Sequence, residues 1–174
     1  MAKLIRPKFN DYPSYYDAYL RLINEDDLNK LLREGLKSFP EWINQNINAD
    51  WNFQYQDGKW TSKEILHHLL DTERILTYRS LCISRDDKTH MPGFDQTGYI
   101  EKVDVSKRTV PSLLTEYKAI RNASLSLFKN MNKKEADRIG YSNGMNVTAR
   151  SLGYVIIGHQ RHHINVLKEL YNFN

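Results

Sequence analysis

The sequence predicts an all-α protein, a four-helix bundle with one long crossover connection between its second and third helices. Three observations carry this prediction. Apolar residues recur at intervals of three and four along four stretches, helix-starting signals precede those stretches, and no convincing strand alternation appears. The chain has 174 residues, 40% of them hydrophobic, which is enough for one ordinary core, so we expect a single domain over residues 1–174.

The first helix is expected to begin after Asn24, a residue type that caps helices well. Asp26 and Asp27 follow, where their charges favour the positive end of the helix dipole. The apolar residues are spaced by threes and fours and share one face: Leu28, Leu31, Leu32, Leu36, Phe39, Ile43 and Ile47. Pro40 lacks an amide donor, so we expect either a kink there or two abutting helices.

The second helix is expected after a loop that closes with Asp57-Gly58, a turn dipeptide. Thr61 and Glu64 have the spacing of a capping box, in which the hydroxyl and the carboxylate each accept a hydrogen bond from a free amide. Apolar residues then recur with helical spacing to about Ser84.

Residues 85–107 show no helical period and include Met91 in the sequence Met-Pro-Gly-Phe. A connection of this length usually either crosses the fold or covers a site. The third helix is expected to begin at Thr109, with Pro111 in its first turn where the missing amide costs nothing, and to continue to about Lys129.

The fourth helix is expected from Thr148 to about Tyr171, after a loop that contains Gly140 and Asn143-Gly144. Its apolar stripe has intervals of four, three, four, three and four, which is the inward seam of a bundle helix. The members of this seam are Leu152, Ile156, His159, His163, Val166 and Leu170.

Two histidines on this seam point to chemistry. His159 and His163 lie one turn apart, so their imidazoles can reach a single ion from the same side. A lone core histidine is commonly satisfied by one hydrogen bond, but two stacked on one seam are harder to satisfy in that way. The same spacing also occurs by chance in many helices, so the pattern alone leaves a metal site and a structural pair as alternatives.

A third histidine comes from the second helix, where His67 and His68 are neighbours. With about 100° per residue, the apolar side chains centre roughly 100° from His68 and roughly 155° from His67. His68 is therefore expected at the edge of the buried face and His67 in water. His162 lies off the seam of the fourth helix and could support the ligands from behind, whereas His90 is expected to be an exposed histidine.

Composition narrows the functional classes. The net charge is +4, but basic and acidic residues are interspersed and no binding motif accompanies them, so we expect no nucleic-acid partner. No apolar run approaches about 20 residues and the amino terminus lacks a signal-peptide stretch, so we expect a cytoplasmic protein without a membrane partner. The single Cys82 is expected to be a small core residue.

The sequence resembles the DinB/YfiT-like superfamily of metal-dependent enzymes. Three segments carry the resemblance: Gly58 to Arg74, which includes Trp60 and His68, Met91 to Gln96, and Gly158 to His163. The combination of Trp-x7-His with a later Gly-His-x-x-x-His, in this order, is fairly specific, and the likeness extends from the first helix to the carboxyl end.

The resemblance implies a dimeric four-helix bundle that holds a divalent metal, nickel or zinc, with three histidines. The ligands carried over are His68, eight residues after the tryptophan, with His159 and His163. The choice of His68 agrees with the face argument above. Characterised relatives include thiol S-transferases that use bacillithiol or mycothiol and a thiol-dependent isomerase, so the resemblance does not fix the reaction or the substrate.

We therefore expect a metal-dependent enzyme, either a thiol S-transferase or a hydrolase, that acts on a small electrophilic substrate and works with a low-molecular-weight thiol in the first case. The alternative is a non-catalytic dimeric binding or stress-response protein whose metal is structural or vestigial. Six residues near the site have open roles. Those in the second helix orient imidazoles, anchor a carboxylate or form surface ion pairs, and those in the crossover either cover the open coordination position or do not: Asp71, Glu73 and Arg74, then Asp95, Gln96 and Tyr99.

Overall fold

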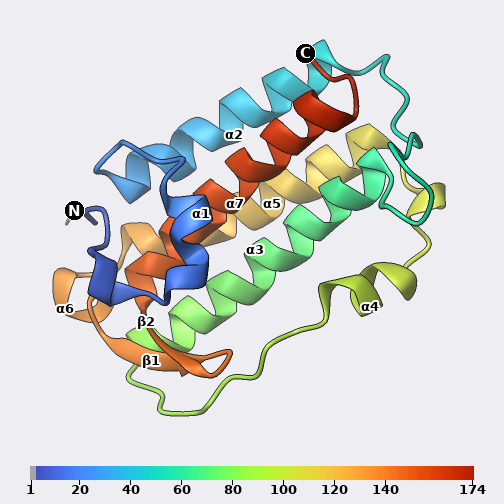
Figure 1. Cartoon of the computed structure of the whole chain (residues 1–174). Helices are drawn as coiled ribbons and strands as arrows, with labels where there is room; N and C mark the ends of the chain where they lie inside the picture. Colours follow the sequence, from blue (N-terminus) through green and yellow to red (C-terminus); the bar gives the residue numbers. More distant parts are fainter. Residues whose placement is uncertain (1–2) are drawn as a thin grey trace.

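Four long helices lie side by side in the computed structural model, which describes residues 3–174 (Figure 1). They are α2 (Leu28–Gln45), α3 (Ser62–Ser84), α5 (Val110–Lys129) and α7 (Ala149–Leu170). Helices α3 and α2 each pack against both α5 and α7, so every helix of the four has two neighbours. The predicted four-helix bundle is confirmed. No helix among the described residues is long and apolar enough to cross a lipid bilayer.

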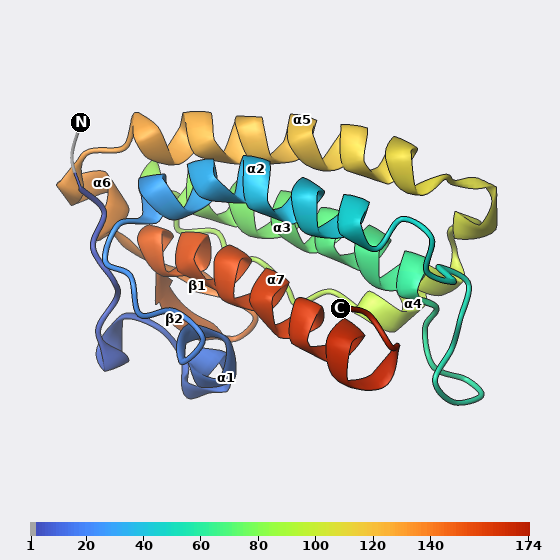
Figure 2. The same cartoon turned by 90° about the horizontal axis from the view of Figure 1, so that it is seen from above.

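The chain order makes one connection long. Helices α2 and α7 run in one direction along the bundle, and α3 and α5 run in the opposite direction (Figure 2). Because α3 and α5 are parallel, the chain must return along the bundle between them. Residues 85–109 make this return and contain α4 (Gln96–Glu101), which packs against α3, and a 3-10 helix (Val105–Lys107). The predicted crossover is confirmed.

Three helix starts follow the capping signals in the sequence. The hydroxyls of Thr61, Thr109 and Thr148 each accept a hydrogen bond from the amide three residues further on, at 3.1, 3.2 and 3.3 Å. The Glu64 carboxylate completes the capping box by accepting from the Thr61 amide at 2.6 Å. Helices α3, α5 and α7 begin directly after these threonines.

Helix α2 departs from the prediction at its start. The cap is Asp27 rather than Asn24, because the Asp27 carboxylate accepts from the Lys30 amide at 3.1 Å. The helix then continues through Pro40 to Gln45 as one element, so the expectation of two abutting helices is wrong. Pro40 is buried, on the same side as the apolar face of this helix.

A β-hairpin precedes α7 and was missed by the sequence prediction. Strand β1 (Ile139–Ser142) pairs antiparallel with β2 (Met145–Thr148) across a two-residue turn. Asn143 and Gly144 both have positive φ, 50° and 78°, as the tightest hairpin turns require. Strands of four residues are too short to show a clear alternation of apolar and polar residues. The Asn-Gly dipeptide between them was the signal from which the hairpin could have been predicted.

The segment before α2 packs along α7. It forms two 3-10 helices and a short α-helix: Phe9–Asp11, Ser14–Tyr16 and α1 (Asp17–Leu20). The Tyr154 hydroxyl donates to the Leu4 carbonyl at 3.0 Å, and α1 lies against the middle of α7. The amino-terminal segment therefore closes one side of the bundle beside the later histidines.

A buried polar layer divides the core into two hydrophobic clusters. One cluster lies at the hairpin end and includes Leu76 and Ile156, and the other lies at the opposite end and includes Leu70 and Leu167. Between them the helices place buried polar residues: His68, Thr72 and Glu73 from α3, Arg121 and Ser124 from α5, and His159 and Gln160 from α7. Buried polar groups need partners, so this layer is where chemistry is expected.

Gly158 allows α1 to lie close to α7 immediately beside His159. A β-carbon at position 158 would lie 2.4 Å from the carbonyl oxygen of Tyr19, and a backbone atom cannot swing aside as a side chain can. We expect Gly158→Ala to displace α1 and to lower the free energy of unfolding by about 1–3 kcal/mol, measured by urea denaturation. Alanine alone favours a helix over glycine, so a stabilised variant would contradict this close approach.

Candidate metal centre

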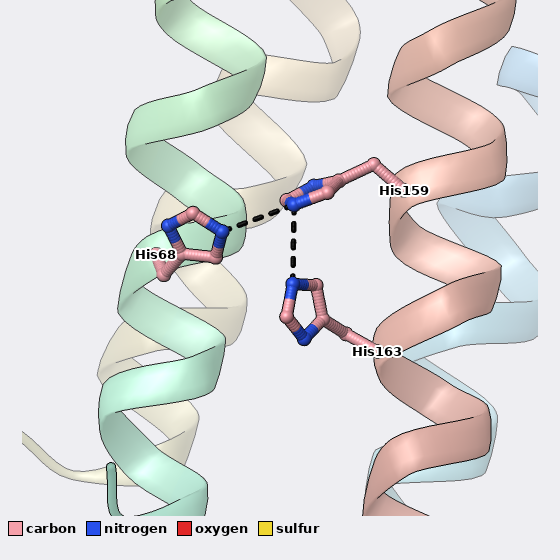
Figure 3. Close-up of side chains that lie close together, drawn as sticks. All are labelled: His68, His159 and His163. Atoms are coloured by element: carbon pink, nitrogen blue, oxygen red, sulfur yellow. Dashed lines mark hydrogen bonds between the residues drawn. The ribbon is translucent and has the colours of Figure 1, made fainter. Parts of the chain in front are cut away.

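Three histidine side chains from two helices converge in the buried layer (Figure 3). Nε2 of His68, on α3, lies 3.0 Å from Nε2 of His159 on α7, and Nε2 of His163 lies 3.1 Å from the same atom. All three ligand nitrogens lie within 4.8 Å of one another. The fold therefore brings together the three histidines predicted from the sequence, although His68 and His159 are 91 residues apart in the chain.

The donor set fits a cation better than it fits a hydrogen-bond network. A neutral imidazole has one N–H donor and one lone pair, and Nε2 of His159 faces two other Nε2 atoms at once. Nδ1 of His163 is buried and has no hydrogen-bond partner among the described residues. Ligand nitrogens about 2.0–2.1 Å from one zinc-like ion lie roughly 3 Å or slightly more from each other, and the two separations to Nε2 of His159 have this size.

Neighbouring side chains fix the rings. The Thr72 hydroxyl lies 3.4 Å from Nδ1 of His68, one helical turn further along α3, so it can accept from an Nδ1–H and leave the Nε2 lone pair facing the cluster. The Trp60 ring lies 4.9 Å from the His68 ring, centroid to centroid, and the Tyr19 ring meets His159 edge-on at 5.3 Å. These contacts hold two of the three imidazoles from behind.

Burial keeps the three imidazoles neutral. Loss of solvation lowers the pKa of His68 to about 4 and that of His163 to about 3, and it lowers the pKa of His159 well below its usual value. The neighbouring histidines add to the effect, because a second positive charge nearby disfavours protonation. At neutral pH all three therefore present lone pairs, which is the form that binds metal.

These shifts predict how the stability of the metal-free protein depends on pH. Below about pH 6.5 the unfolded chain binds protons at His68 and His163 and the folded chain does not, so the free energy of unfolding falls as pH drops from 6.5 towards 4 and 3. Urea denaturation at several pH values measures the slope. We expect a shallower slope for His68→Gln than for wild type. Equal slopes for wild type and His68→Gln would refute the assignment.

The position of His67 corrects the sequence prediction. Its side chain was expected in water, but it is buried, with 8% of the residue exposed, and its Nε2 lies 3.4 Å from Asp71. Helix α3 contacts both α7 and α5, so its buried surface is wider than the single apolar face that the prediction assumed. His67 nevertheless is not one of the three converging histidines and pairs with Asp71 instead.

The acidic and basic residues of α3 form ion pairs. Asp71 lies near His67 and Arg74, with 3.5 Å between the Asp71 and Arg74 side chains, and Arg74 also pairs with Glu116 at 2.6 Å. Glu73 pairs with Arg121. Among the roles that the sequence left open for Asp71, Glu73 and Arg74, their contacts support the ion pair. The residue that supports His68 is Thr72.

A buried ion pair lies directly beside the histidines. Arg121, 1% exposed, donates from Nε and Nη2 to the two carboxylate oxygens of Glu73 at 2.7 and 2.8 Å. Its Nη2 also donates to the side-chain oxygen of Gln160 at 2.6 Å, and the Tyr117 hydroxyl donates to the same oxygen at 3.2 Å. Because Gln160 follows His159, this network fixes α7 against α3 and α5 at the level of the cluster.

Two cavities reach the cluster from different sides. One of about 270 Å³ is lined by His159 together with Thr72 and Arg79 from α3 and Tyr19 from α1. The other, of about 550 Å³, is lined by His163 with Trp60 and His162. A further cavity, of about 570 Å³, is lined mainly by residues of α2 and α7. We place the chemistry at the first two because each is lined by one of the converging histidines and has room for a small molecule, whereas a third space beside His159 holds only about 10 Å³.

The crossover contributes one of its three expected residues. Gln96 lines both cavities at the cluster. Asp95 instead caps α4 by accepting from the amides of Thr97 and Gly98, each at 3.1 Å, and Tyr99 is half exposed and packs against Phe94. The crossover thus lies over the site through Gln96 and through three residues that were not expected there, Gly93, Phe94 and Thr97.

The remaining single residues have structural positions. His162 is half-buried, lies edge-on to Tyr19 at 5.5 Å, and lines the second cavity. Cys82 is partly buried and packs against the core, close to expectation. His90 is exposed as predicted and stacks on Tyr141 at 4.2 Å.

Sequence reasoning missed the cavity residues outside the histidine motifs. The first cavity also takes Tyr15, Tyr16 and Tyr19 from the amino-terminal segment, and Arg79 from α3. The cluster of tyrosines before the first predicted helix is visible in the sequence, but the prediction assigned it no role. An arginine in an otherwise apolar stretch of α3 was another, because a buried guanidinium needs a partner.

Comparisons with known proteins identify the family and the fold. A family model described as the DinB superfamily matches residues 31–167. A protein of Bacillus pumilus (strain SAFR-032) named "Putative metal-dependent hydrolase" is 23% identical over 145 residues, which are 82% of this chain and 82% of that protein. The fold is similar to a solved structure described as "YfiT from Bacillus subtilis is a probable metal-dependent hydrolase with an unusual four-helix bundle topology", with a TM-score of 0.72, 18% identity, and coverage of 95% of this chain and 91% of the other.

Proposed function

The chain belongs to the DinB superfamily, and from that premise we propose that it is a metal-dependent hydrolase whose divalent ion is held by His68, His159 and His163. One observation carries the proposal. Three neutral imidazole nitrogens converge beside two cavities, one lined by His159 and the other by His163, so three ligands leave room for water and substrate. The names of the related proteins support the same reading.

The residues present determine what the site can do. A divalent ion held by three histidines lowers the pKa of bound water and polarises a carbonyl oxygen, and imidazole suits both zinc and nickel. The Thr72 hydroxyl, 3.4 Å from Nδ1 of His68, would favour the tautomer that leaves Nε2 free by accepting from an Nδ1–H. Burial raises the pKa of the Tyr19 phenol, so this group stays protonated at neutral pH and can donate a hydrogen bond to a substrate in the cavity beside His159.

The test begins with metal content. The untagged protein is purified and its metals are measured by elemental analysis, with about one equivalent of a divalent metal expected. Hydrolysis of small chromogenic esters and amides is then followed before and after chelation, and the rate is expected to fall with metal content and to return on adding zinc or nickel. One bound equivalent without turnover of any ester, amide or thiol pair would favour a structural metal in a non-catalytic binding protein. Less than a tenth of an equivalent, with none regained, would reject the metal site.

Thiol S-transfer is a second candidate, and the second cavity favours it. Hydrolysis needs room for one substrate and water, whereas S-transfer needs room for two molecules, and a space of about 550 Å³ lies beside His163 in addition to the one beside His159. In this reaction the thiolate sulfur attacks the electrophilic carbon, the leaving group departs with the bonding electrons, and the thiol proton goes to it or to solvent.

Product masses separate the two reactions. Metal-loaded protein is incubated with an electrophile in the presence of bacillithiol, glutathione or cysteine. A hydroxylated product whose yield does not depend on thiol supports hydrolysis. A thioether product formed faster than the spontaneous reaction supports S-transfer and removes hydrolysis from the lead.

A further inference from the structure

Arg79 is a buried cation whose charge has no carboxylate partner among the described residues. Only 5% of the residue is exposed. Its Nη2 donates to the Pro92 carbonyl at 2.5 Å, and its guanidinium lies 5.8 Å from the centre of the Phe94 ring. These contacts leave Nε and Nη1 without a hydrogen-bond partner within residues 3–174.

The other buried arginines show what is usual in this protein. Arg121 pairs with Glu73, and Arg150 pairs with Asp11 at 2.5 Å and with Asp137 at 2.8 Å. A buried charge is costly unless an opposite charge or a set of hydrogen bonds compensates it. Arg79 thus differs from Arg121 and Arg150 in having no carboxylate partner among the described residues, and it lies at the wall of a cavity.

That cavity is the one beside His159. His68, Thr72 and Arg79 lie along one stripe of α3, separated by four and seven residues, so the arginine and the candidate ligand face the same side of the helix. Eleven residues of helix rise by roughly 16 Å, and a long helical side chain leans back towards the amino end. A molecule that contacts both groups therefore carries its anionic end several bonds away from its reacting atom.

We propose that the substrate is a small carboxylate, with Arg79 binding its carboxylate group while the reacting carbonyl lies at His68, His159 and His163. This inference rests on the proposed hydrolase function. A guanidinium presents two parallel donors that match the two oxygens of a carboxylate. Among the lining residues of this cavity Arg79 is the one with a fixed charge, which balances one carboxylate rather than a dianionic phosphate.

The cavity walls fit such a molecule. Tyr15 and Tyr19 carry phenol groups at the wall, and Asn143 and Gln96 add amide groups from the hairpin and the crossover. Leu76, Phe94 and Val155 supply apolar surface between the arginine and the histidines. A volume of about 270 Å³ limits the ligand to a small molecule with an aliphatic chain between its two polar ends.

Binding of matched probes tests this inference without requiring turnover. Hexanoate and hexanamide differ in charge and have nearly the same shape, so their affinities for the full-length protein are compared by calorimetry at pH 8. The measurement is made on metal-loaded and on chelated protein, because a carboxylate can also bind a metal ion directly. We expect hexanoate to bind at least 10-fold more tightly than hexanamide in both forms.

Variants then locate the interaction. Arg79→Gln is expected to remove the preference for hexanoate, and Arg79→Lys is expected to restore part of it. Arg74→Gln, on the exposed side of the same helix, serves as the matched control and should keep the preference. Equal binding of the two probes by wild type, an undiminished preference in a folded Arg79→Gln, or tighter binding of pentyl phosphate than of hexanoate would each overturn the proposal. The comparison of hexanoate with hexanamide on wild type needs no variant. It can therefore overturn the proposal even if Arg79→Gln fails to fold.

The hydrolase assay stays independent of this result. If the metal-loaded protein turns over esters but shows no preference for carboxylates, the proposed function stands and the role of Arg79 is wrong. If the chelated protein prefers hexanoate but no turnover is found with metal, the anion site stands and the hydrolase is wrong. Where both hold, kcat/KM for a hemiester with a free carboxylate should exceed that for its methyl diester at least 10-fold, and Arg79→Gln should equalise them.

Discussion

His159→Gln is expected to remove bound metal and to lower metal-dependent turnover by more than about 100-fold. Nε2 of His159 is the atom that both His68 and His163 face, at 3.0 and 3.1 Å, so its loss leaves two ligands that no longer share a centre. Changes to groups that merely support a ligand already cost about 10–100-fold in metal affinity, and a ligand itself should cost more. Elemental analysis and initial rates at saturating metal measure the two effects.

His67→Gln is the matched control for this variant. His67 is the immediate neighbour of a proposed ligand and is buried like it, but it pairs with Asp71. We expect the control to keep about one metal equivalent. If His67→Gln lost metal as fully as His159→Gln, the effect would come from disturbance of the helix packing and the ligand assignment would fail.

Glu73→Gln is expected to destabilise the protein by about 3–5 kcal/mol, the largest stability effect that the structure predicts. The substitution leaves the Arg121 guanidinium, 1% exposed, without its compensating charge in the middle of the bundle. The loss is measured as the free energy of unfolding in urea at pH 7, where two-state behaviour can be checked with two optical probes.

The double variant Glu73→Leu, Arg121→Met supplies the control. Apolar replacement of both members of a buried ion pair is often neutral or stabilising, so most of the lost stability should return. If the double variant were as unstable as the single one, then the cost would arise from the hydrogen bonds to Gln160 and not from the uncompensated charge. In either case metal content should be followed, because Gln160 adjoins His159.

Local signals predicted the bundle well. Each cap at Thr61, Thr109 and Thr148 is a hydrogen bond between residues three positions apart, so the local sequence is enough to predict it. The seam of α7 was correct from Leu152 to His159, which are buried, but Leu170 is 44% exposed and Leu167 takes the inner position instead. Residues at alternating intervals of three and four recur every 3.5 residues on average, so on a straight helix of 3.6 residues per turn they move gradually off the buried face. The predicted burial is therefore less accurate towards the end of the seam.

The site was predicted in part because its ligands lie on regular elements. Face geometry and the family resemblance chose His68, His159 and His163, and the fold brings the three together. The same geometry misplaced His67, because burial on a second side depends on which helices pack against α3. Arg79, Thr72 and Tyr19 could not be assigned from spacing, since their roles arise from contacts between segments distant in the chain.

The use of both chain halves for one site has a consequence during synthesis on the ribosome. His68 emerges early, but His159 and His163 lie on α7, which is translated after every other element of the structure. A nascent chain therefore holds one ligand of the three until α7 leaves the exit tunnel. Metal capture should consequently follow the emergence of α7, and chains stalled before residue 159 should carry no metal even when the earlier helices have formed.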